Sequence, residues 1–133
     1  MLRTTLLVLS CLISSSVFAD VNTLSVVDGD TVKYQGQRLR LQSIDTPETY
    51  KPRCDSELKQ GKAATARLRE LIANAGNIEI IDSGRIDPYK RPLVDLILDG
   101  KNVGYTLINE GLAIEWRPGR DAWEARRRHW CGN

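Results

Sequence analysis

Short runs of apolar and β-branched residues, separated by turn signals, dominate the chain just after residue 20. These runs cover residues 21–27, 31–34 and 37–44. Asp28-Gly29 stands between the first two runs and Gln35-Gly36 between the second and third. Gly-containing pairs of this kind are typical of tight turns between antiparallel strands. The pattern therefore predicts a three-stranded antiparallel meander.

Residues 56–75 show a different periodicity, with apolar residues recurring every three or four positions, as on one face of a helix. The apolar positions are Leu58, Ala64, Leu68, Leu71, Ile72 and Ala75. Asp55 or Ser56 is expected to cap this helix, and Gly76 is expected to end it.

The rest of the chain predicts two more strands and two more helices. The strands are expected at 77–81 and 93–98, with a loop over 82–90; one helix follows the cap residue Asn102 to residue 110, and the last covers 121–129. The order is three strands, a helix, two strands and two helices. This order predicts an α+β fold, mainly β: a five-stranded Greek-key barrel of the OB type with three helices.

The first 19 residues are typical of a secretory signal peptide, with Arg3 before an apolar run over residues 6–13 and Val17-Phe18-Ala19 as a cleavage signal. The alternative is a transmembrane anchor, but the run is far shorter than the ~20 residues that a bilayer requires. We expect cleavage after Ala19, no membrane anchor afterwards, and one monomeric domain over 20–133, secreted or periplasmic.

Composition limits the chemistry that this domain can perform. The chain carries 19 Lys and Arg against 17 Asp and Glu, a net charge of +2 that becomes +1 when Arg3 leaves with the signal. A single His excludes a three-histidine metal site. Nucleic-acid binding would therefore depend on a few placed cations and a metal, because no broad positive field is present.

Cleavage would remove Cys11 and leave Cys54 and Cys131. In an oxidising compartment two remaining cysteines are most simply a disulfide. The alternative is a pair of unpaired buried thiols. A zinc site is not indicated, because only His129 lies near and no Cys-x-x-Cys pair exists.

Several polar segments each have an ordinary structural explanation. Asp28-Gly29-Asp30 is typical of a hairpin turn, and Asp45-Thr46-Pro47-Glu48 resembles a helix cap, although no helical pattern follows at once. Arg40 in the third strand and Arg91 in a later loop are each most simply surface cations.

Together the same residues indicate a specific chemistry. Asp30 and Asp45 supply hard oxygen donors suited to Ca²⁺ or Mg²⁺. Arg40 and Arg91 suit a phosphate, because a guanidinium donates two parallel hydrogen bonds. Glu48 adds a carboxylate that can orient or deprotonate water. The set is what metal-assisted cleavage of a phosphodiester requires.

Four segments carry a resemblance to a known family, and they occur in that family's order: VVDGDTVKYQGQ, RLRLQSIDTPET, DPYKRPL and NEGLA. At these residues the sequence resembles the staphylococcal nuclease (thermonuclease) family. The resemblance covers roughly residues 21–116. It implies an OB barrel with three helices and an enzyme that hydrolyses DNA and RNA, leaving 3′-phosphate ends.

The resemblance also assigns roles to individual residues. Asp30 and Asp45 would bind Ca²⁺ through carboxylates and Thr46 through its backbone carbonyl, with Asp28 as a nearby contributor. By the same comparison Arg40 and Arg91 would bind the phosphate. Glu48 would position the attacking water.

Other positions depart from the family pattern. Tyr89 still suits base stacking, and Lys90 stands where the family commonly has Gly. Trp116 and Arg117 stand near the place of the family's pocket tyrosines and are candidate substrate contacts, with core packing the alternative for Trp116.

The basic C-terminal stretch is a candidate track for a nucleic-acid backbone, although a charged helix face explains it more simply. Its cations are Arg117, Arg120 and residues 126–128. Two rival functions remain for the whole chain: a non-catalytic OB-fold nucleic-acid-binding module, and a Ca²⁺-binding structural domain that would leave Arg40 and Arg91 without a role.

Overall fold

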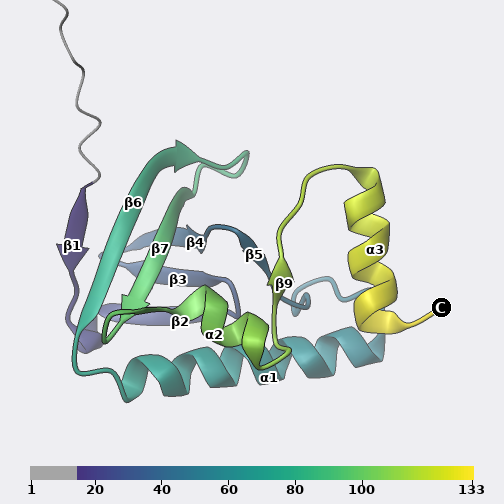
Figure 1. Cartoon of the computed structure of the whole chain (residues 1–133), viewed down its shortest axis with the longest axis horizontal. Coiled ribbons are helices and arrows are strands. Elements are labelled where there is room, and N and C mark those ends of the chain that lie inside the picture. The colour runs from purple at the N-terminus through teal and green to yellow at the C-terminus, as the bar shows by residue number, and fades with distance from the viewer. Residues whose placement is uncertain (1–14) are drawn as a thin grey trace, which may run out of the picture.

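The computed structural model describes residues 15–133 and is built around one curled, mixed β-sheet (Figure 1). Its strands are β1 (Ser16–Phe18), β2 (Leu24–Asp28), β3 (Thr31–Tyr34), β4 (Gln37–Leu41), β6 (Ile78–Ile86), β7 (Pro92–Leu98) and β8 (Lys101–Asn102). A separate two-stranded sheet joins β5 (Ile44–Asp45) and β9 (Ile114–Glu115). A 3₁₀ turn over Val21–Thr23 leads into β2.

The strand order confirms the expected architecture. The main sheet runs β1-β6-β7-β4-β3-β2, with β8 beside β7. The meander β2-β3-β4 and the pair β6-β7 are antiparallel, and β4 and β7 are parallel where they meet. The five long strands therefore form the predicted OB-type arrangement, a partly open Greek-key barrel in an α+β, mainly β fold.

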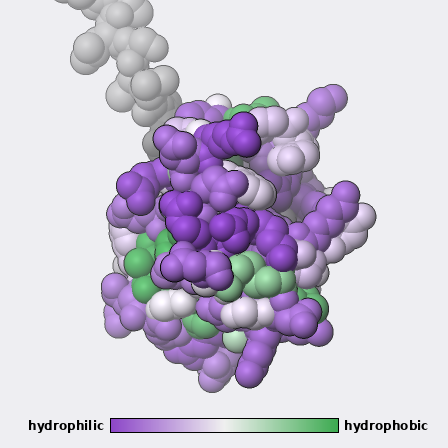
Figure 2. All heavy atoms as spheres, turned by 90° about the vertical axis from the view of Figure 1, so that its right-hand side faces the viewer, coloured by the Kyte–Doolittle hydropathy of each residue, from purple (hydrophilic) through white to green (hydrophobic). Residues whose placement is uncertain are grey.

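Three helices accompany the sheet: α1 (Asp55–Ala73), α2 (Val103–Asn109) and α3 (Arg120–Cys131). The long helix α1 passes beneath the sheet, and α3 stands over the N-terminal end of α1 (Figure 1). The Asn102 side chain caps α2 by accepting a hydrogen bond from the Gly104 N–H, as predicted. The face of the molecule that carries α3 is largely hydrophilic (Figure 2).

Strand alternation and the helical stripe both point into one core. Alternate residues of β7 are buried, as are Leu68 and Ile72 on α1. The β7 residues are Val94, Leu96 and Leu98. Apolar residues repeat every two positions on the strand and about every 3.6 positions on the helix, so one face of each element is buried.

The ends of α1 differ from the prediction. Cys54 caps the helix, because its Sγ accepts a hydrogen bond from the Glu57 N–H at 3.3 Å, and Asp55 is already helical. At the other end Asn74 is the C-cap and keeps a right-handed conformation. Gly76 does not take the left-handed conformation of a helix-ending glycine; Asp99 instead accepts hydrogen bonds from its N–H.

Two strand limits also differ. The strand predicted over 37–44 breaks after Leu41, because Ser43 has a positive φ of 66° and turns the chain into β5. β6 continues to Ile86, where a loop was predicted, because it pairs with β7 again beyond an irregularity after Asp82.

The predicted signal peptide lies mostly outside the described residues, which start at 15. Ser16–Phe18 forms the exposed edge strand β1, paired with Glu79–Ile81 of β6. All three residues of β1 are exposed, so β1 adds no side chain to the core. In the described part of the chain no helix has the length and apolar character of a membrane span. Cleavage after Ala19 remains a prediction.

A disulfide between Cys54 and Cys131 joins the start of α1 to the end of α3, as the cysteine count predicted. The Cα atoms lie 5.9 Å apart, and the two residues are 77 positions apart in sequence. A cross-link over so long a loop removes much entropy from the unfolded chain.

Loss of this disulfide is expected to lower the free energy of unfolding by roughly 4–5 kcal/mol, the chain-entropy value for such a loop. The test is urea unfolding of the protein and of Cys54→Ser/Cys131→Ser, each with and without reductant. Serine at position 54 keeps a good helix cap, so the double variant isolates the cross-link. An equal unfolding midpoint for the protein with and without reductant would contradict this expectation.

Candidate active site

Three adjacent strands bring the candidate residues together. Thr31 on β3 pairs with Arg40 on β4, and Arg40 in turn pairs with Leu93 on β7. Arg91 lies just before β7, and Asp30 just before β3. The sheet register therefore gathers residues that are far apart in sequence.

Arg40 is buried at the centre of this group. Its Nη2 lies 3.2 Å from Asp30 Oδ2 and 3.6 Å from Asp45 Oδ1, and both carboxylates are nearly buried. The Thr46 N–H donates a hydrogen bond to Asp30 Oδ2 at 3.3 Å. Asp30, Asp45 and the backbone of Thr46 thus lie together, and Arg40 is an internal cation rather than a surface one.

Arg91 joins the same group through Thr31. Its Nη1 donates to Thr31 Oγ1 at 3.2 Å, and that hydroxyl donates to Asp30 Oδ1 at 3.0 Å. Asp87 orients Arg91 by accepting from its Nε at 2.7 Å. Burial alone would raise the pKa of Asp87, but hydrogen bonds from Arg91 hold that pKa below its usual value. The sequence analysis missed Asp87, although its position four residues before Arg91 was a usable signal.

The acidic groups crowd one another. Burial, followed by the charge of Asp30, raises the pKa of Asp28 to about 6, and the same two causes raise the pKa of Asp45 to about 6. Burial and the carboxylates of Asp30 and Asp45 raise the pKa of Glu48 to about 7. Such repulsion is what a bound cation relieves.

The donors present suit a hard cation. Asp30 and Asp45 supply carboxylates and Thr46 supplies a carbonyl, which are the oxygen ligands that Ca²⁺ and Mg²⁺ prefer. Asp28 is close, because its Oδ1 accepts from the Asp30 N–H at 3.2 Å. Within residues 15–133 no cluster of three acidic, His or Cys side chains forms a ready-made metal cage. Water would therefore have to complete the coordination.

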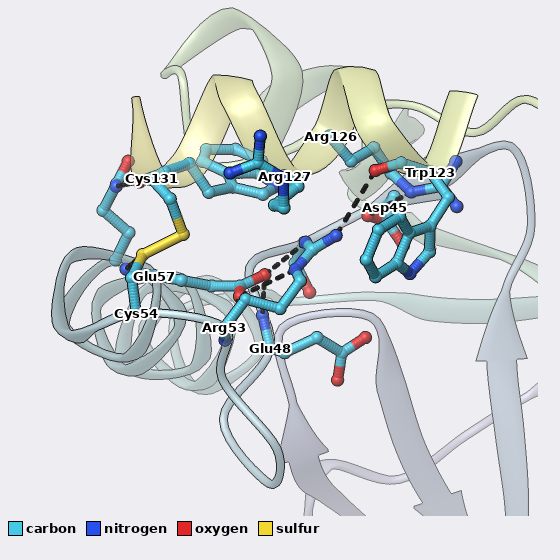
Figure 3. Close-up of polar contacts among 12 residues, drawn as sticks. Asp45, Glu48, Arg53, Cys54, Glu57, Trp123, Arg126, Arg127 and Cys131 are labelled. Atoms are coloured by element: carbon cyan, nitrogen blue, oxygen red, sulfur yellow. Dashed lines mark hydrogen bonds and ion pairs between the residues drawn. A yellow bond between two sulfur atoms is a disulfide. The ribbon is translucent and has the colours of Figure 1, made fainter. Parts of the chain in front are cut away.

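Glu48 is positioned by a close contact between its loop and α1. A Cβ at Gly61 would lie 2.6 Å from the Pro47 carbonyl oxygen, so only glycine lets the loop approach the helix here. One turn earlier on α1, Glu57 Oε1 accepts a hydrogen bond from the Glu48 N–H at 3.2 Å (Figure 3).

Glu57 is the main residue that the sequence analysis missed. Its carboxylate is completely buried and receives the Arg53 guanidinium and, at 2.7 Å, the Arg53 N–H. Burial alone would raise the pKa of Glu57, but hydrogen bonds from Arg53 and Glu48 hold it below its usual value. A signal existed: Glu57 continues the spacing of Gly61, Ala64 and Leu68, and so belongs to the buried face of α1.

Helix α3 also reaches the site, through a residue assigned earlier to a charged helix face. Arg126 Nε lies 3.3 Å from Asp45 Oδ2, and its Nη1 donates to the Arg117 carbonyl at 2.9 Å. Its neighbour Arg127 pairs with Glu124 on the same helix. The basic stretch is therefore partly internal to the site rather than a uniform exposed track.

The predicted substrate contacts lie at the edge of this group. Tyr89 is exposed, with the Arg91 guanidinium 5.4 Å from its ring centroid, and Lys90 beside it is exposed with a positive φ of 61°. Trp116 follows β9, is 49% exposed and is thus not a core residue. Arg117 is also exposed, next to Trp116.

Replacement of Glu57 by Gln is expected to lower the free energy of unfolding on the order of 3 kcal/mol, because it leaves the partly buried Arg53 charge without its partner. Glu110→Gln is the matched control. It breaks the partly exposed pair of Glu110 with Arg67 and is expected to change stability little. Urea unfolding of both variants tests the difference; equal effects would contradict the assigned role of Glu57.

The cost of Glu57→Gln should also depend on pH. A carboxyl whose folded pKa lies below its unfolded value of 4.5 stabilises the fold above pH 4.5, and this contribution disappears as the pH falls through the lowered pKa. The stability gap between the protein and Glu57→Gln is thus expected to be full at pH 7 and to shrink below pH 4.5. Unfolding curves across this range measure the gap, and a gap that widens in acid would refute the expectation.

Comparison with known proteins agrees with this geometry. The family model described as staphylococcal nuclease homologue matches residues 38–128, which include Arg40, Asp45, Glu48 and Arg91. Asp28 and Asp30 lie just before the matched range.

Three relatives illustrate the similarity. The SPbeta prophage-derived endonuclease YokF of Bacillus subtilis is 43% identical over 100 residues, 71% of this chain and 33% of that protein. Endonuclease YncB of Bacillus subtilis is 42% identical over 93 residues, 65% of this chain and 43% of YncB. The thermonuclease of Staphylococcus intermedius is 35% identical over 92 residues, 66% of this chain and 54% of that enzyme.

The matched region spans only about a third to a half of these relatives, so their names describe proteins that are longer than the shared region. The family model nevertheless covers more than half of this chain, and the observed fold agrees with it. The chain belongs to the staphylococcal nuclease homologue family.

Proposed function

We propose that the protein is a secreted or periplasmic, calcium-dependent nuclease that hydrolyses DNA and RNA with little sequence specificity and leaves 3′-phosphate ends. The observation that carries the proposal is the joining of Asp30, Asp45, Arg40 and Arg91 in one network, with Glu48 on the adjoining loop. Both curated endonuclease relatives from Bacillus subtilis support the activity.

The proposed cation would be held by Asp30, Asp45 and the Thr46 carbonyl, with Asp28 close by. When bound, Ca²⁺ supplies positive charge that polarises the phosphate. The two guanidiniums of Arg40 and Arg91 stabilise the negative charge that grows on the nonbridging oxygens during attack. The low net charge of the chain makes these placed cations essential to substrate binding.

Glu48 has the role of orienting the attacking water and accepting its proton. The water oxygen bonds to phosphorus, the bond to the 5′ oxygen breaks, and that oxygen takes a proton from solvent. The hydrogen bond from the Glu48 N–H to Glu57 and the close packing on Gly61 hold this loop in place before substrate arrives. Such preorganisation lowers the cost of reaching the reactive geometry.

Export to an oxidising compartment is proposed on two grounds, the signal-like residues 1–19 and the disulfide Cys54–Cys131. Disulfides persist mainly outside the cytosol. We propose a monomer without a membrane anchor after cleavage at Ala19.

Digestion of plasmid DNA and of RNA with Ca²⁺, Mg²⁺ or EDTA tests the activity. Ca²⁺-stimulated cleavage is expected, and Glu48→Gln is expected to reduce kcat on the order of 10²–10⁴-fold by removing the proton acceptor. Glu110→Gln, which lies in a surface ion pair, is the control. Absence of Ca²⁺-stimulated cleavage would favour a non-catalytic nucleic-acid-binding module, and full activity of Glu48→Gln would refute the role of that residue.

The metal site has a separate test that needs no activity. Excess Ca²⁺ is expected to raise the melting temperature, because a ligand that binds only the folded state stabilises it, and EDTA should reverse the rise. Asp45→Asn should abolish the shift, whereas Asp121→Asn on the exposed first turn of α3 should keep it. A Ca²⁺ shift that survives in Asp45→Asn would place the cation elsewhere.

A further inference from the structure

A pocket beside Glu48 has one wall that the proposed reaction does not use. Its volume is about 250 Å³, and it is lined by Asp45, Glu48, Lys51, Arg53, Trp123 and Arg126. Trp123 and Arg126 come from α3, and the other lining residues come from β5 and the loop that follows it. This size is below that of a pocket enclosing a whole drug-sized ligand and suits one unit of a longer chain.

Trp123 presents an aromatic surface that is fixed in advance. Trp123 is 44% exposed, although the Arg53 guanidinium lies 5.2 Å from the centroid of its ring. Arg53 Nη1 also donates to the Trp123 carbonyl at 3.4 Å, and Glu57 holds Arg53 (Figure 3). An aromatic ring whose orientation is already set binds a flat partner with little loss of side-chain freedom.

The cations around the ring suit a phosphodiester chain. Lys51 reaches the pocket, with its Nζ over the exposed Tyr50 ring at 5.6 Å from the centroid. Arg53 and Arg126 add two guanidiniums, each anchored to a carboxylate. An exposed aromatic ring next to several cations is the combination that binds single-stranded nucleic acid, because bases stack on the ring and the phosphates of the backbone bind the cations.

The position of this wall depends on tertiary links at the middle and at the C-terminal end of α3. Arg126 contacts Asp45 near the middle of the helix, and the disulfide fixes the end of the helix at Cys131. The Gln60 side chain of α1 also donates to the Trp130 carbonyl at 3.0 Å. The ring is thereby held beside Glu48 rather than on a free C-terminal helix.

We propose that Trp123 forms a base-stacking subsite for a nucleotide next to the scissile phosphate, and that the Cys54–Cys131 disulfide keeps this subsite in place. The inference rests on the proposed nuclease function and adds to it a binding subsite on α3, which a DNA or RNA strand reaches only when it is long enough. Bases within a duplex are already stacked on one another, so the subsite acts on single strands, frayed ends and loops.

The test compares Trp123→Ala with the unchanged protein on a dinucleotide and on single-stranded oligonucleotides of increasing length. Stacking contributes enough that kcat/KM on long single strands should fall between about 5-fold and 150-fold, mainly through KM. The dinucleotide and a blunt duplex should change little. Trp123→Phe should restore most of the loss, and Tyr105→Ala, which removes an exposed aromatic ring from α2, is the matched control.

A variant without the disulfide tests whether the cross-link keeps the subsite in place. Cys54→Ser/Cys131→Ser should show a length-dependent loss of the same kind as Trp123→Ala. Adding Trp123→Ala to it should cost less than it does in the protein with the disulfide, because the end of α3 is then no longer fixed to α1. A melting curve for each variant checks that it is folded at the temperature of the assay.

The outcomes separate the subsite from the nuclease itself. Equal losses for the dinucleotide and the long strands would mean that Trp123 acts through Arg53 and the Glu48 loop, and would overturn the subsite. Unchanged kcat/KM in Trp123→Ala on every substrate would also overturn it. If the unchanged protein cleaves no substrate, the nuclease function fails, and the subsite is tested by fluorescence anisotropy with a labelled single strand in EDTA. Weaker binding by Trp123→Ala than by the unchanged protein would then support the subsite. Equal binding by the two proteins would refute the subsite as well.

Discussion

The buried carboxylate of Glu57 is the constraint on which the site depends. A buried charge is tolerated only when it is paired and hydrogen-bonded. The Glu57 carboxylate accepts hydrogen bonds from the Arg53 guanidinium and backbone N–H and from the backbone N–H of Glu48. The need to satisfy one buried group therefore sets the path of the loop that carries Glu48. Arg53 also contacts the carbonyl and the ring of Trp123, so the ion pair with Glu57 helps to fix the position of α3.

A second balance concerns the acidic cluster. Burial and the negative charge of Asp30 raise the pKa values of Asp28, Asp45 and Glu48, and at Asp45 the charges of Arg126 and Arg40 act in the opposite direction. Arg40 comes from the centre of the sheet and Arg126 from the last helix. The two arginines thus offset part of the acidic charge, and the cluster still has oxygen donors suited to a cation.

These contacts bear on how a chain of low net charge would bind the nucleic-acid substrate proposed above. The positions of the cations matter more than their number. Arg40 and Arg91 belong to the network of the proposed reaction centre, and Lys51, Arg53 and Arg126 line the same pocket as Trp123. Short-range, partly desolvated charges of this kind are screened less by salt than a diffuse basic surface is. The long-range field contributes little at a net charge near zero.

Much of this protein could be predicted from local pattern. Period-2 runs, turn signals and a helical stripe were enough for the element order and for the OB-type strand arrangement, because each depends on residues close in sequence. Chemistry and the family resemblance singled out Asp30, Arg40, Asp45, Glu48 and Arg91, and the roles of these residues stay predictions. The errors were equally local: Ser43 broke a strand, β6 continued past Asp82, and Cys54 rather than Asp55 capped α1.

Only the tertiary structure decided which of these residues share one environment. The sequence determined the kinds of groups available, namely carboxylates, guanidiniums, one cysteine pair and an almost neutral balance. The burial of Glu57, the turn of Arg126 toward Asp45 and the placement of Trp123 beside Glu48 all follow from docking of α3 on the start of α1. The physical reason is that desolvation and ion pairing depend on distances in space between segments up to about 80 residues apart, which no local pattern encodes.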